Sequence, residues 1–208
     1  MGYYPIFLEM AGRSCLVVGG GPVAERKVGG LLEVGACLTV VSPAVTPQLD
    51  DWAREGRIRL VRHAYESSDL AGQSLAFVAT DDGVVNADVA RDARTAGVLI
   101  NAADDPAHCD FILPAVLRRG ELTVTVSTGG ASPALSRMLR DELDTYLARE
   151  DYAALVSVAA GARRALRAEG VRAPWERWRN ALDAELRGLV TAGRLGEARE
   201  RLVERLGD

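Results

Sequence analysis

Apolar residues recur along residues 14–101 with two distinct periods. Five short, nearly continuous runs of aliphatic and β-branched residues are typical of strands buried on both faces of a sheet, namely SCLVV, ACLTVVS, RIRLV, SLAFVAT and GVLINA. Segments with a helical period separate these runs at residues 22–33, 46–54 and 84–96. Strand, helix and strand in this order predict a doubly wound, parallel α/β sheet of the Rossmann type.

The pattern changes after Asp110. The runs FILPAVLR and LTVTVST, joined through RRGE, indicate a pair of strands, and Ser132 with Pro133 supplies an N-cap and a first-turn proline for a following helix. Leucines then repeat every four residues along that helix, at Leu135, Leu139, Leu143 and Leu147. Two strands and one helix are too small to be stable alone. We therefore expect this region to pack against the first domain or against a second copy of the chain, and we predict a homodimer.

Residues 149–208 have a helical pattern throughout. One apolar stripe consists of Leu155, Val158, Ala162 and Leu166, and a second consists of Trp175, Trp178, Leu182 and Leu189. Breaks are expected at Gly170–Pro174 and at Gly193. We divide the chain into a Rossmann domain at 1–112, a small α+β dimerisation region at 113–148 and an all-α subdomain at 149–208.

The composition excludes several classes of protein. Of the 208 residues, 48% are hydrophobic and 26% charged, which is close to globular averages. The net charge of −4 combines −6 over residues 1–148 with +2 over residues 149–208, so there is no basic nucleic-acid footprint. No run approaches a membrane span, the N-terminus lacks a basic secretory start, and the three cysteines form no ligand cluster. We expect a cytoplasmic protein that binds no nucleic acid, membrane or structural metal.

A glycine-rich turn gives the first chemical signal. In LVVGGGPVAERK, Gly19, Gly21 and Ala24 match G-x-G-x-x-A between a predicted strand and a predicted helix. Glycines allow close approach to a diphosphate, and the helix start offers backbone amides and the positive end of its dipole. Pro22 lacks an amide, but this matters little at the first helical position. The placement after the first strand favours a dinucleotide over an ordinary glycine-rich turn.

The test that usually separates NAD from NADP gives no clear answer here. An acidic residue is expected at the end of the second strand, where the chain instead reads Val41, Ser42, Pro43 and Ala44. Ser42 could bond a ribose hydroxyl, or these residues could form an ordinary turn. Because no Arg or Lys occurs at this turn, we prefer NAD. The residues assigned to the cofactor are Gly19, Gly21, Pro22, Val23, Ala24, Ser42, Pro43, Ala44 and Thr80.

Two further segments carry candidate chemistry. NAADDPAHCDFILPA follows the fifth predicted strand at its carboxyl end and holds Asp104, Asp105, His108 and Asp110, a density that favours proton transfer but also suits a solvated loop. STGGASP leads into a helix beside several arginines, at positions 118, 119, 137 and 140. This second segment would suit a polycarboxylate ligand or would simply be a capped helix with exposed arginines.

These segments together resemble the precorrin-2 dehydrogenase family, also called sirohydrochlorin ferrochelatase, the amino-terminal module of siroheme synthases. The resemblance rests on YPIFLEMAGRSCLVVGGGPVAERKVGGLLEVGACLTVVSP, FVATDD, INAADDPAHCDFILPA and VSTGGASPALSRMLRDELD, which occur in the family's order. It covers residues 3 to about 147. It implies a Rossmann domain, a dimerisation region that exchanges elements with a partner subunit, and a helical carboxyl-terminal part.

The resemblance also implies an activity. This is the oxidation of precorrin-2 to sirohydrochlorin with NAD as hydride acceptor and, in some members, the insertion of ferrous iron to give siroheme. The family's aspartate in the N-x-x-D position falls on Asp104. It would accept a proton in the first reaction or receive pyrrole protons in the second, and Asp105 is the second choice. The family's phosphorylatable serine corresponds to Thr128, so we do not expect that regulation here.

Two other functions remain open from the sequence. One is a non-catalytic sensor or carrier that binds nucleotide and tetrapyrrole, which the missing ribose acid favours. The other is a dehydrogenase without chelatase activity, which no residue distinguishes from the bifunctional enzyme. Since the sequence ends at Asp208, we expect no methyltransferase module, and a separate enzyme would supply precorrin-2. The slightly basic tail is compatible with holding a tetrapyrrole that carries many carboxylates.

Overall fold

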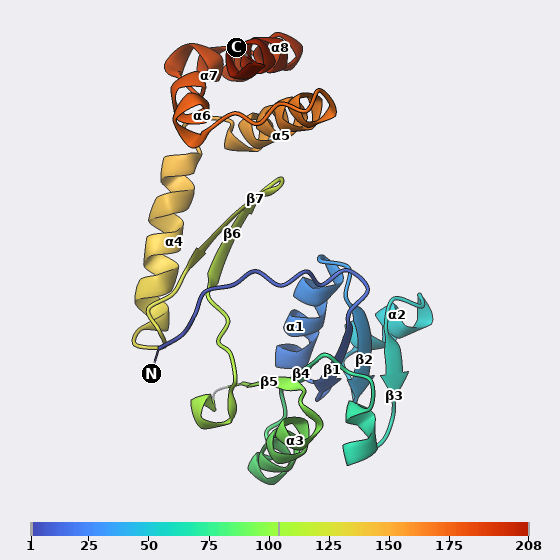
Figure 1. The fold of residues 1–208 in the computed structure, drawn as a ribbon. Coiled ribbons are helices and arrows are strands. Elements are labelled where there is room, and N and C mark those ends of the chain that lie inside the picture. Colours follow the sequence, from blue (N-terminus) through green and yellow to red (C-terminus); the bar gives the residue numbers. More distant parts are fainter. Residues whose placement is uncertain (1, 104, 208) are drawn as a thin grey trace. The chain divides into compact units, whose positions relative to one another are not determined.

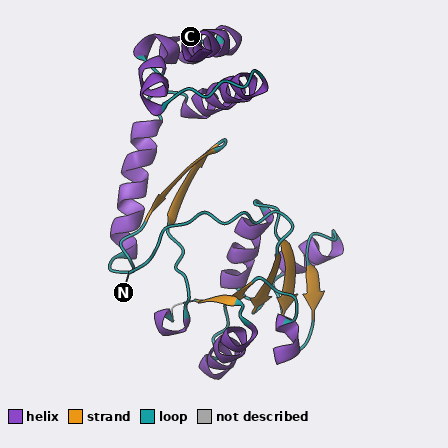
Figure 2. Cartoon of the chain, in the orientation of Figure 1, coloured by secondary structure: helices purple, strands orange, loops and turns teal. Residues whose placement is uncertain are grey.

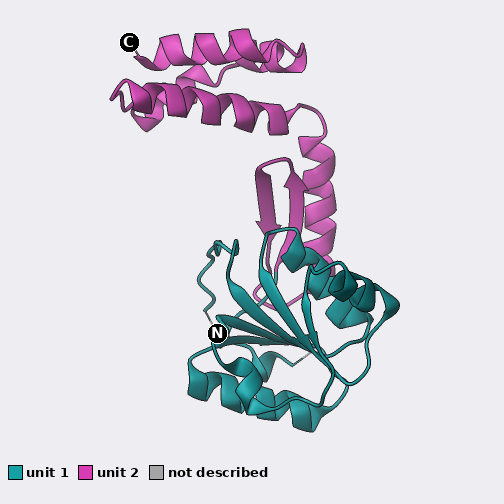
Figure 3. Cartoon of the chain, turned by 90° about the vertical axis from the view of Figure 1, so that its right-hand side faces the viewer, with its two compact units in different colours: residues 1–113 teal, residues 114–208 magenta. Residues whose placement is uncertain are grey.

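The computed structural model describes residues 2–103 and 105–207. The chain forms two compact units, residues 1–113 and residues 114–208 (Figure 3). The first contains a parallel sheet with its helices, and the second contains a hairpin and five helices among the described residues. The division into three parts at residues 112 and 148 stays a prediction.

The first unit is built around five parallel strands in the order β3-β2-β1-β4-β5 (Figure 1). The strands are β1 (Ser14–Val18), β2 (Cys37–Val41), β3 (Arg59–Val61), β4 (Leu75–Val78) and β5 (Leu99–Ala102). The helices are α1 (Pro22–Leu32), α2 (Pro47–Arg54) and α3 (Gly83–Ala96), and a short 3-10 helix, η1 (Ser67–Leu70), precedes β4. The predicted α/β fold class is confirmed, and the five strands fall within the five predicted runs.

Two apolar layers explain why the strand residues do not alternate with polar ones. Cys15 and Val17 face a core that contains residues of α1 and α2, whereas Leu16 and Val18 face a core that contains residues of α3. Both faces of β1 are therefore buried, as expected for a parallel sheet. Local signals set the helix boundaries: the Thr46 side chain accepts the Leu49 N–H at 3.4 Å, which confirms that N-cap.

The second unit begins with an antiparallel hairpin and a long helix (Figure 2). These elements are β6 (Ala115–Arg119), β7 (Leu122–Val126) and α4 (Pro133–Leu147), with Ala115 opposite Val126. The strand predicted from Phe111 starts only at Ala115, because the Phe111 ring packs edge-on against Phe77 in the first unit. The leucine stripe of α4 is split: Leu139 and Leu147 are partly buried, while Leu135 and Leu143 are exposed.

Four helices make up the remainder of the second unit. They are α5 (Tyr152–Ala168), α6 (Trp175–Ala181), α7 (Ala184–Thr191) and α8 (Leu195–Gly207). The first predicted stripe is confirmed, since Val158, Ala162 and Leu166 lie in their common core. The second was partly wrong, because Trp175 is 72% exposed and Leu186 and Val190 fill the core instead. Among the described helices, none combines the length and apolar character that crossing a bilayer requires.

Candidate functional site

The candidate site lies at the carboxyl edge of the parallel sheet. From β1 the strand order runs outward in two directions, to β2 and β3 on one side and to β4 and β5 on the other. Open α/β sheets bind ligands where the order reverses in this way. Here the reversal lies between the turn after β1, residues 19–21, and the segment after β4, residues 79–82.

Two glycines of the turn are required by packing alone. Gly19 has a φ of +124°, and a Cβ there would lie 2.3 Å from the carbonyl oxygen of Ala79, after β4. A Cβ on Gly20 would lie 1.9 Å from the carbonyl oxygen of Ala44, after β2. The turn therefore packs tightly against the residues that follow both neighbouring strands, β2 and β4. The sequence motif included Gly19 but treated Gly20 as a variable position, although its steric restriction is as severe.

Gly21 differs from these two, because its open side faces no described atom within 4 Å of a built Cβ. It is the N-cap of α1 and has no side chain to cap the helix, with Pro22 at the first position. The first-turn amides of Val23 and Ala24 follow, at the positive end of the helix dipole. Ala24 is 0% exposed and lies in the apolar core with residues of β1, so its side chain does not face a ligand. This geometry fits a diphosphate.

The turn after β2 has the expected residues and no carboxylate. Ser42 is buried, and its hydroxyl donates to the carbonyl oxygen of Ala44 over 2.7 Å, so its proton is used within the turn. The Ser42 lone pairs remain for a ribose hydroxyl, and Pro43 and Ala44 are exposed. Their roles toward a cofactor stay predictions.

The structure brings one basic residue to this end of the sheet that sequence reasoning did not consider. The Ser42 N–H donates to the carbonyl oxygen of Val61, the last residue of β3, and Arg62 follows. The Arg62 guanidinium forms an ion pair with Asp50 of α2. No sequence pattern indicated this, because Arg62 is distant from the β2 turn along the chain.

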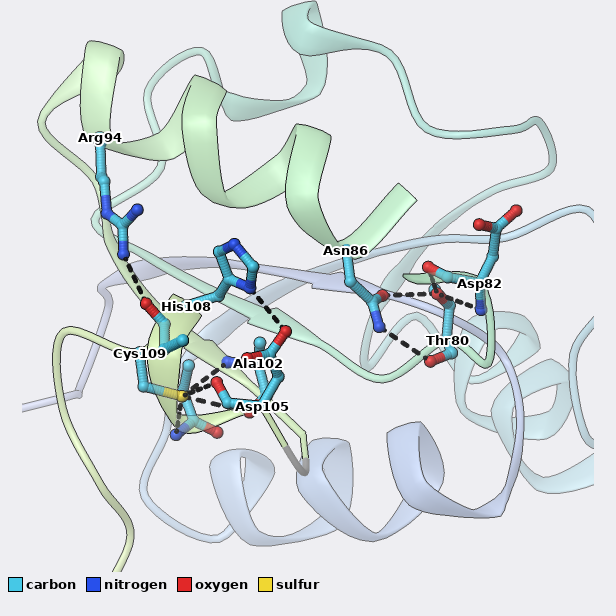
Figure 4. Close-up of polar contacts among 10 residues, drawn as sticks. Thr80, Asp82, Asn86, Arg94, Ala102, Asp105, His108 and Cys109 are labelled. Carbon is cyan, nitrogen blue, oxygen red and sulfur yellow. Dashed lines mark hydrogen bonds and ion pairs between the residues drawn. The ribbon is translucent and has the colours of Figure 1, made fainter. Parts of the chain in front are cut away.

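Thr80 lies in the segment after β4 and is held by the first turn of α3 (Figure 4). Its hydroxyl is 2.6 Å from Asn86 Oδ1, and Asn86 Nδ2 donates to the Thr80 carbonyl oxygen over 3.2 Å. Asp82 caps the helix by accepting the Val84 N–H at 2.9 Å. Sequence reasoning missed Asn86, whose only signal was an amide side chain in a predicted first turn. It fixes this segment beside the turn after β1.

Asp104, the predicted catalytic residue, lies outside the described residues. On the sheet side of it, the Ala103 N–H donates to the carbonyl oxygen of Val78 over 2.9 Å. On the other side, Asp105 Oδ2 is 2.5 Å from His108 Nδ1 (Figure 4). This bond is the main reason that the pKa of the Asp105 carboxyl lies below its ordinary value. Asp105 therefore stays ionised at neutral pH.

The residues after Asp105 return along β5. They include η2 (Pro106–His108), after which the Cys109 thiol accepts the Ala102 N–H at 3.2 Å. Burial raises the pKa of that thiol, so it keeps its proton. Asp110 Oδ2 accepts the Ile100 N–H at 3.0 Å, and the Asp110 N–H donates to the Ile100 carbonyl oxygen over 2.8 Å. Three of the four titratable residues named for the predicted loop, Asp105, His108 and Asp110, thus form bonds within the loop or to β5.

A partly buried polar link joins α1 to β5. Lys27, the single lysine of the sequence, donates from Nζ to Asn101 Oδ1 over 2.9 Å. Asn101 Nδ2 in turn donates to the carbonyl oxygen of Phe111 over 2.9 Å. The Lys27 ammonium also lies 5.4 Å from the centroid of the Phe77 ring. Sequence reasoning missed Lys27, and only the tertiary structure shows that the helix after the glycine turn and β5 share this contact.

In the second unit, the STGGASP turn is a well-bonded helix cap. Ser132 Oγ accepts the Leu135 N–H at 3.2 Å, which confirms the predicted N-cap. Thr128 Oγ1 accepts the Ser132 N–H at 3.0 Å and lies 3.2 Å from Ser136 Oγ. Arg119 and Arg140 form ion pairs with carboxylates of α4. A helix-capping role therefore accounts for the described geometry of this segment.

The edge of the sheet thus combines an anion-binding turn with a loop that carries carboxylates. Such an arrangement can hold a dinucleotide diphosphate at the turn and place proton-transferring groups beside the far end of the cofactor. The residues present fit a dinucleotide, because Gly21 leaves its ligand-facing side open while Gly19 and Gly20 close the turn onto the sheet.

Comparisons with known proteins agree with this geometry. A family model described as putative NAD(P)-binding matches residues 6–115, and a second, described as sirohaem biosynthesis protein central, matches residues 119–145. The siroheme synthase of Nitrosococcus oceani is 41% identical over 95% of this chain, and that of Methylococcus capsulatus is 40% identical over 98%. The solved structure of SirC, a precorrin-2 dehydrogenase, aligns with a TM-score of 0.75 at 27% identity. The alignment covers 97% of this chain and 100% of the SirC chain.

The two comparisons differ in how much of each relative they cover. This chain spans 42% of the Nitrosococcus enzyme and 43% of the Methylococcus enzyme, somewhat under half of each. The match to SirC extends over nearly all of this chain and the whole of SirC. The resemblance recognised in the sequence is therefore confirmed, and it extends past residue 147 into the helical region.

Proposed function

This chain belongs to the putative NAD(P)-binding family, and we propose that it catalyses the NAD-dependent oxidation of precorrin-2 to sirohydrochlorin. The observation that carries the proposal is the likeness to SirC, which covers 97% of this chain and 100% of SirC. The glycine turn at the strand-order reversal supports it, because that turn fits the diphosphate of a dinucleotide.

The residues divide the work between binding and proton transfer. The first-turn amides of α1, at Val23 and Ala24, would hold the diphosphate, and the turn from Ser42 to Ala44 would line the adenosine ribose. Bound NAD would supply the hydride acceptor for one hydrogen of the substrate, while the second hydrogen leaves as a proton. Thr80 would line the nicotinamide half, held in place by Asn86.

Asp104 is our candidate for the group that receives this proton. In the sequence it stands two residues after the last residue of β5, and it occupies the family's aspartate position. We expect Asp104→Ala to lower kcat at least about 100-fold, the usual size of a lost acid–base group, and to leave the Kd for NAD unchanged. A variant with full turnover would remove Asp104 from the mechanism.

The decisive assay follows NADH formation by stopped flow after precorrin-2 is mixed with protein and NAD. We expect NADH and sirohydrochlorin in equal amounts, since each turnover removes one hydride and one proton. Binding of NAD without NADH formation would instead favour the sensor or carrier alternative. Absence of both binding and turnover would contradict either reading.

We also propose that the protein inserts ferrous iron into sirohydrochlorin, with the metal as substrate. The observation that favours this second activity is the name siroheme synthase borne by the relatives, although they are more than twice as long as this chain. Absorption spectra after ferrous iron is added to sirohydrochlorin would test it. If iron were inserted no faster than in the absence of protein, the chelatase proposal would fail and only the dehydrogenase proposal would stand.

A homodimer is the assembly we propose. On α4, Leu135, Met138, Leu143 and Tyr146 are exposed although large and apolar. A second copy would remove these side chains from water. Light scattering at micromolar concentration should give twice the monomer mass, and Met138→Glu should shift the equilibrium toward monomer because it buries a charge. A monomeric wild type would contradict the proposal.

A further inference from the structure

The helical part of the second unit contains an open groove between α5 and α8. These two helices lie side by side and share one apolar core (Figure 1). The groove has a volume of about 220 Å³, and small residues form part of its lining, at Ser157, Gly161 and Gly196. Each helix also contributes one arginine, Arg164 from α5 and Arg199 from α8. Among the described residues that line the groove, none is acidic.

The glycine of α5 determines how Arg199 lies in this groove. A Cβ built on Gly161 would lie 3.1 Å from Cδ of Arg199, which is closer than an ordinary van der Waals contact. The missing side chain therefore allows the stem of Arg199 to pack directly against α5. Because residues three apart are neighbours on a helix, the Arg199 stem meets α5 on the face that carries Arg164.

Neither arginine of the groove is neutralised by a carboxylate. The positions three and four residues away from Arg164 and from Arg199 on their own helices hold no Asp or Glu, so an intrahelical ion pair is not available. Within the described part of the chain, neither forms a salt bridge to another element. Other arginines of the same helical region do pair with carboxylates, namely Arg187, Arg194, Arg201 and Arg205.

Two positive groups beside one groove favour an anionic ligand. Like charges repel each other, and an oxyanion placed between them replaces this repulsion with attraction. Guanidinium groups suit this role, because their N–H donors form a planar fork that matches the oxygens of a carboxylate or a phosphate. The Ser157 hydroxyl adds a further donor to the lining. Arg164 and Arg199 are both exposed, so a ligand can reach them from solvent.

We propose that the groove between α5 and α8 is a binding site for an oxyanion group, a carboxylate or a phosphate, which Arg164 and Arg199 hold. This chemistry has two possible sources, the carboxylate arms of a tetrapyrrole and a free phosphate ion. The tetrapyrrole source rests on the proposed function, whereas the site itself does not. The site lies within the second unit and uses no residue of the glycine turn.

Amide NMR spectra of the full chain test the site locally. Inorganic phosphate or sirohydrochlorin is added at constant ionic strength, and the amide signals of Gly161 and Gly196 are followed. We expect at least one of the two ligands to shift both signals in a saturable manner, which potassium chloride should not do. Saturation by sirohydrochlorin would identify the tetrapyrrole as the source, and saturation by phosphate alone would identify a free anion. The signals of Gly19 and Gly21 report separately on binding at the glycine turn.

Single substitutions assign the binding to the two arginines. Arg164→Gln and Arg199→Gln each remove one positive charge and keep most of the side-chain stem. We expect each variant to raise the Kd of the saturating ligand at least about tenfold, equivalent to about 1.4 kcal/mol. Arg163→Gln is the matched control, because Arg163 is exposed on the same helix but does not line the groove. It should keep the wild-type Kd.

Thermal unfolding without ligand distinguishes binding from a structural role. Because the two charges repel each other, Arg164→Gln should keep or raise the unfolding midpoint at low salt. A lower midpoint would assign Arg164 to stabilising the fold and contradict the proposal.

The remaining outcomes are also distinct. The absence of a saturable shift at Gly161 and Gly196 with either ligand would overturn the site, and so would an equal loss of affinity in Arg163→Gln. If the wild type formed no NADH from precorrin-2, the proposed function would fail, but saturation of the groove by phosphate would still support the site.

Discussion

The glycine turn after β1 and the loop after β5 lie at the same edge of one sheet, yet different forces hold them. Gly19 and Gly20 are fixed by backbone packing against the ends of β4 and β2, without any titratable group. The β5 loop is fixed by side chains, among them the Asp105–His108 pair and Asp110. The turn should therefore tolerate changes of pH but no added volume at Gly19 or Gly20, and the loop should not tolerate the loss of a polar partner.

The largest expected effect comes from Gly20→Ala. A Cβ 1.9 Å from a backbone oxygen cannot be accommodated without moving the ends of both β1 and β2. We expect the free energy of unfolding to fall by about 3 kcal/mol and NAD binding to be lost. Urea unfolding and NAD titration measure the two effects. Wild-type stability in this variant would show that packing does not fix the turn.

Gly21→Ala should affect binding alone. The φ of Gly21 is −82°, which alanine adopts without strain, and the open side has room for a methyl group. That methyl would stand where a diphosphate approaches, so we expect the Kd for NAD to rise at least about tenfold, equivalent to about 1.4 kcal/mol. Gly30→Ala, in the same helix and also open, is the control and should keep the Kd.

Asn86→Ala tests the segment after β4. It removes the partner of the Thr80 hydroxyl and a donor to the Thr80 carbonyl oxygen. We expect a loss of stability of about 1 to 2 kcal/mol and a severalfold rise in the KM for NAD. An unchanged KM together with reduced stability would limit Asn86 to a structural role. Thermal unfolding and initial rates distinguish the two cases.

The pH dependence sharpens the contrast between the two regions. Because the folded-state pKa of Asp105 is lowered, its bond to His108 stabilises the protein above the ordinary aspartate pKa and is lost as the pH falls through the lowered value. The stability difference between wild type and His108→Ala should thus shrink in acid, as measured by urea unfolding. The difference between wild type and Gly20→Ala should not shrink.

The smallest effect concerns the choice of cofactor. Asp50→Ala removes the carboxylate that pairs with Arg62, which follows β3 beside the turn that we propose lines the ribose. A released guanidinium favours a 2′-phosphate, so the ratio of NADP to NAD use should rise a few-fold. Steady-state kinetics with both cofactors measure this ratio. A fall in the ratio would place Arg62 outside the reach of the ribose.

Much of this molecule could be predicted from local pattern. The five strands, the helices between them and the caps at Thr46 and Ser132 follow from periodicity and from side chains that bond within a few residues. The exposed Trp175 shows where the sequence pattern fails. An apolar stripe can be assigned to a helical segment in more than one way when the elements that pack against it are unknown. The same holds for the site. The motifs identified its loops, but they did not predict which side chains those loops contact.

By itself, the sequence determined the parallel sheet, the glycine turn and the family, because each depends on residues close together in the chain. Only the tertiary structure decided that Gly20 is sterically locked, that Lys27 reaches Asn101 and that Arg62 follows β3 beside the turn after β2. These contacts join residues from different strands and helices. Periodicity and spacing carry no information on which side chains a folded sheet brings together, since that depends on strand order and on the packing of helices across its faces.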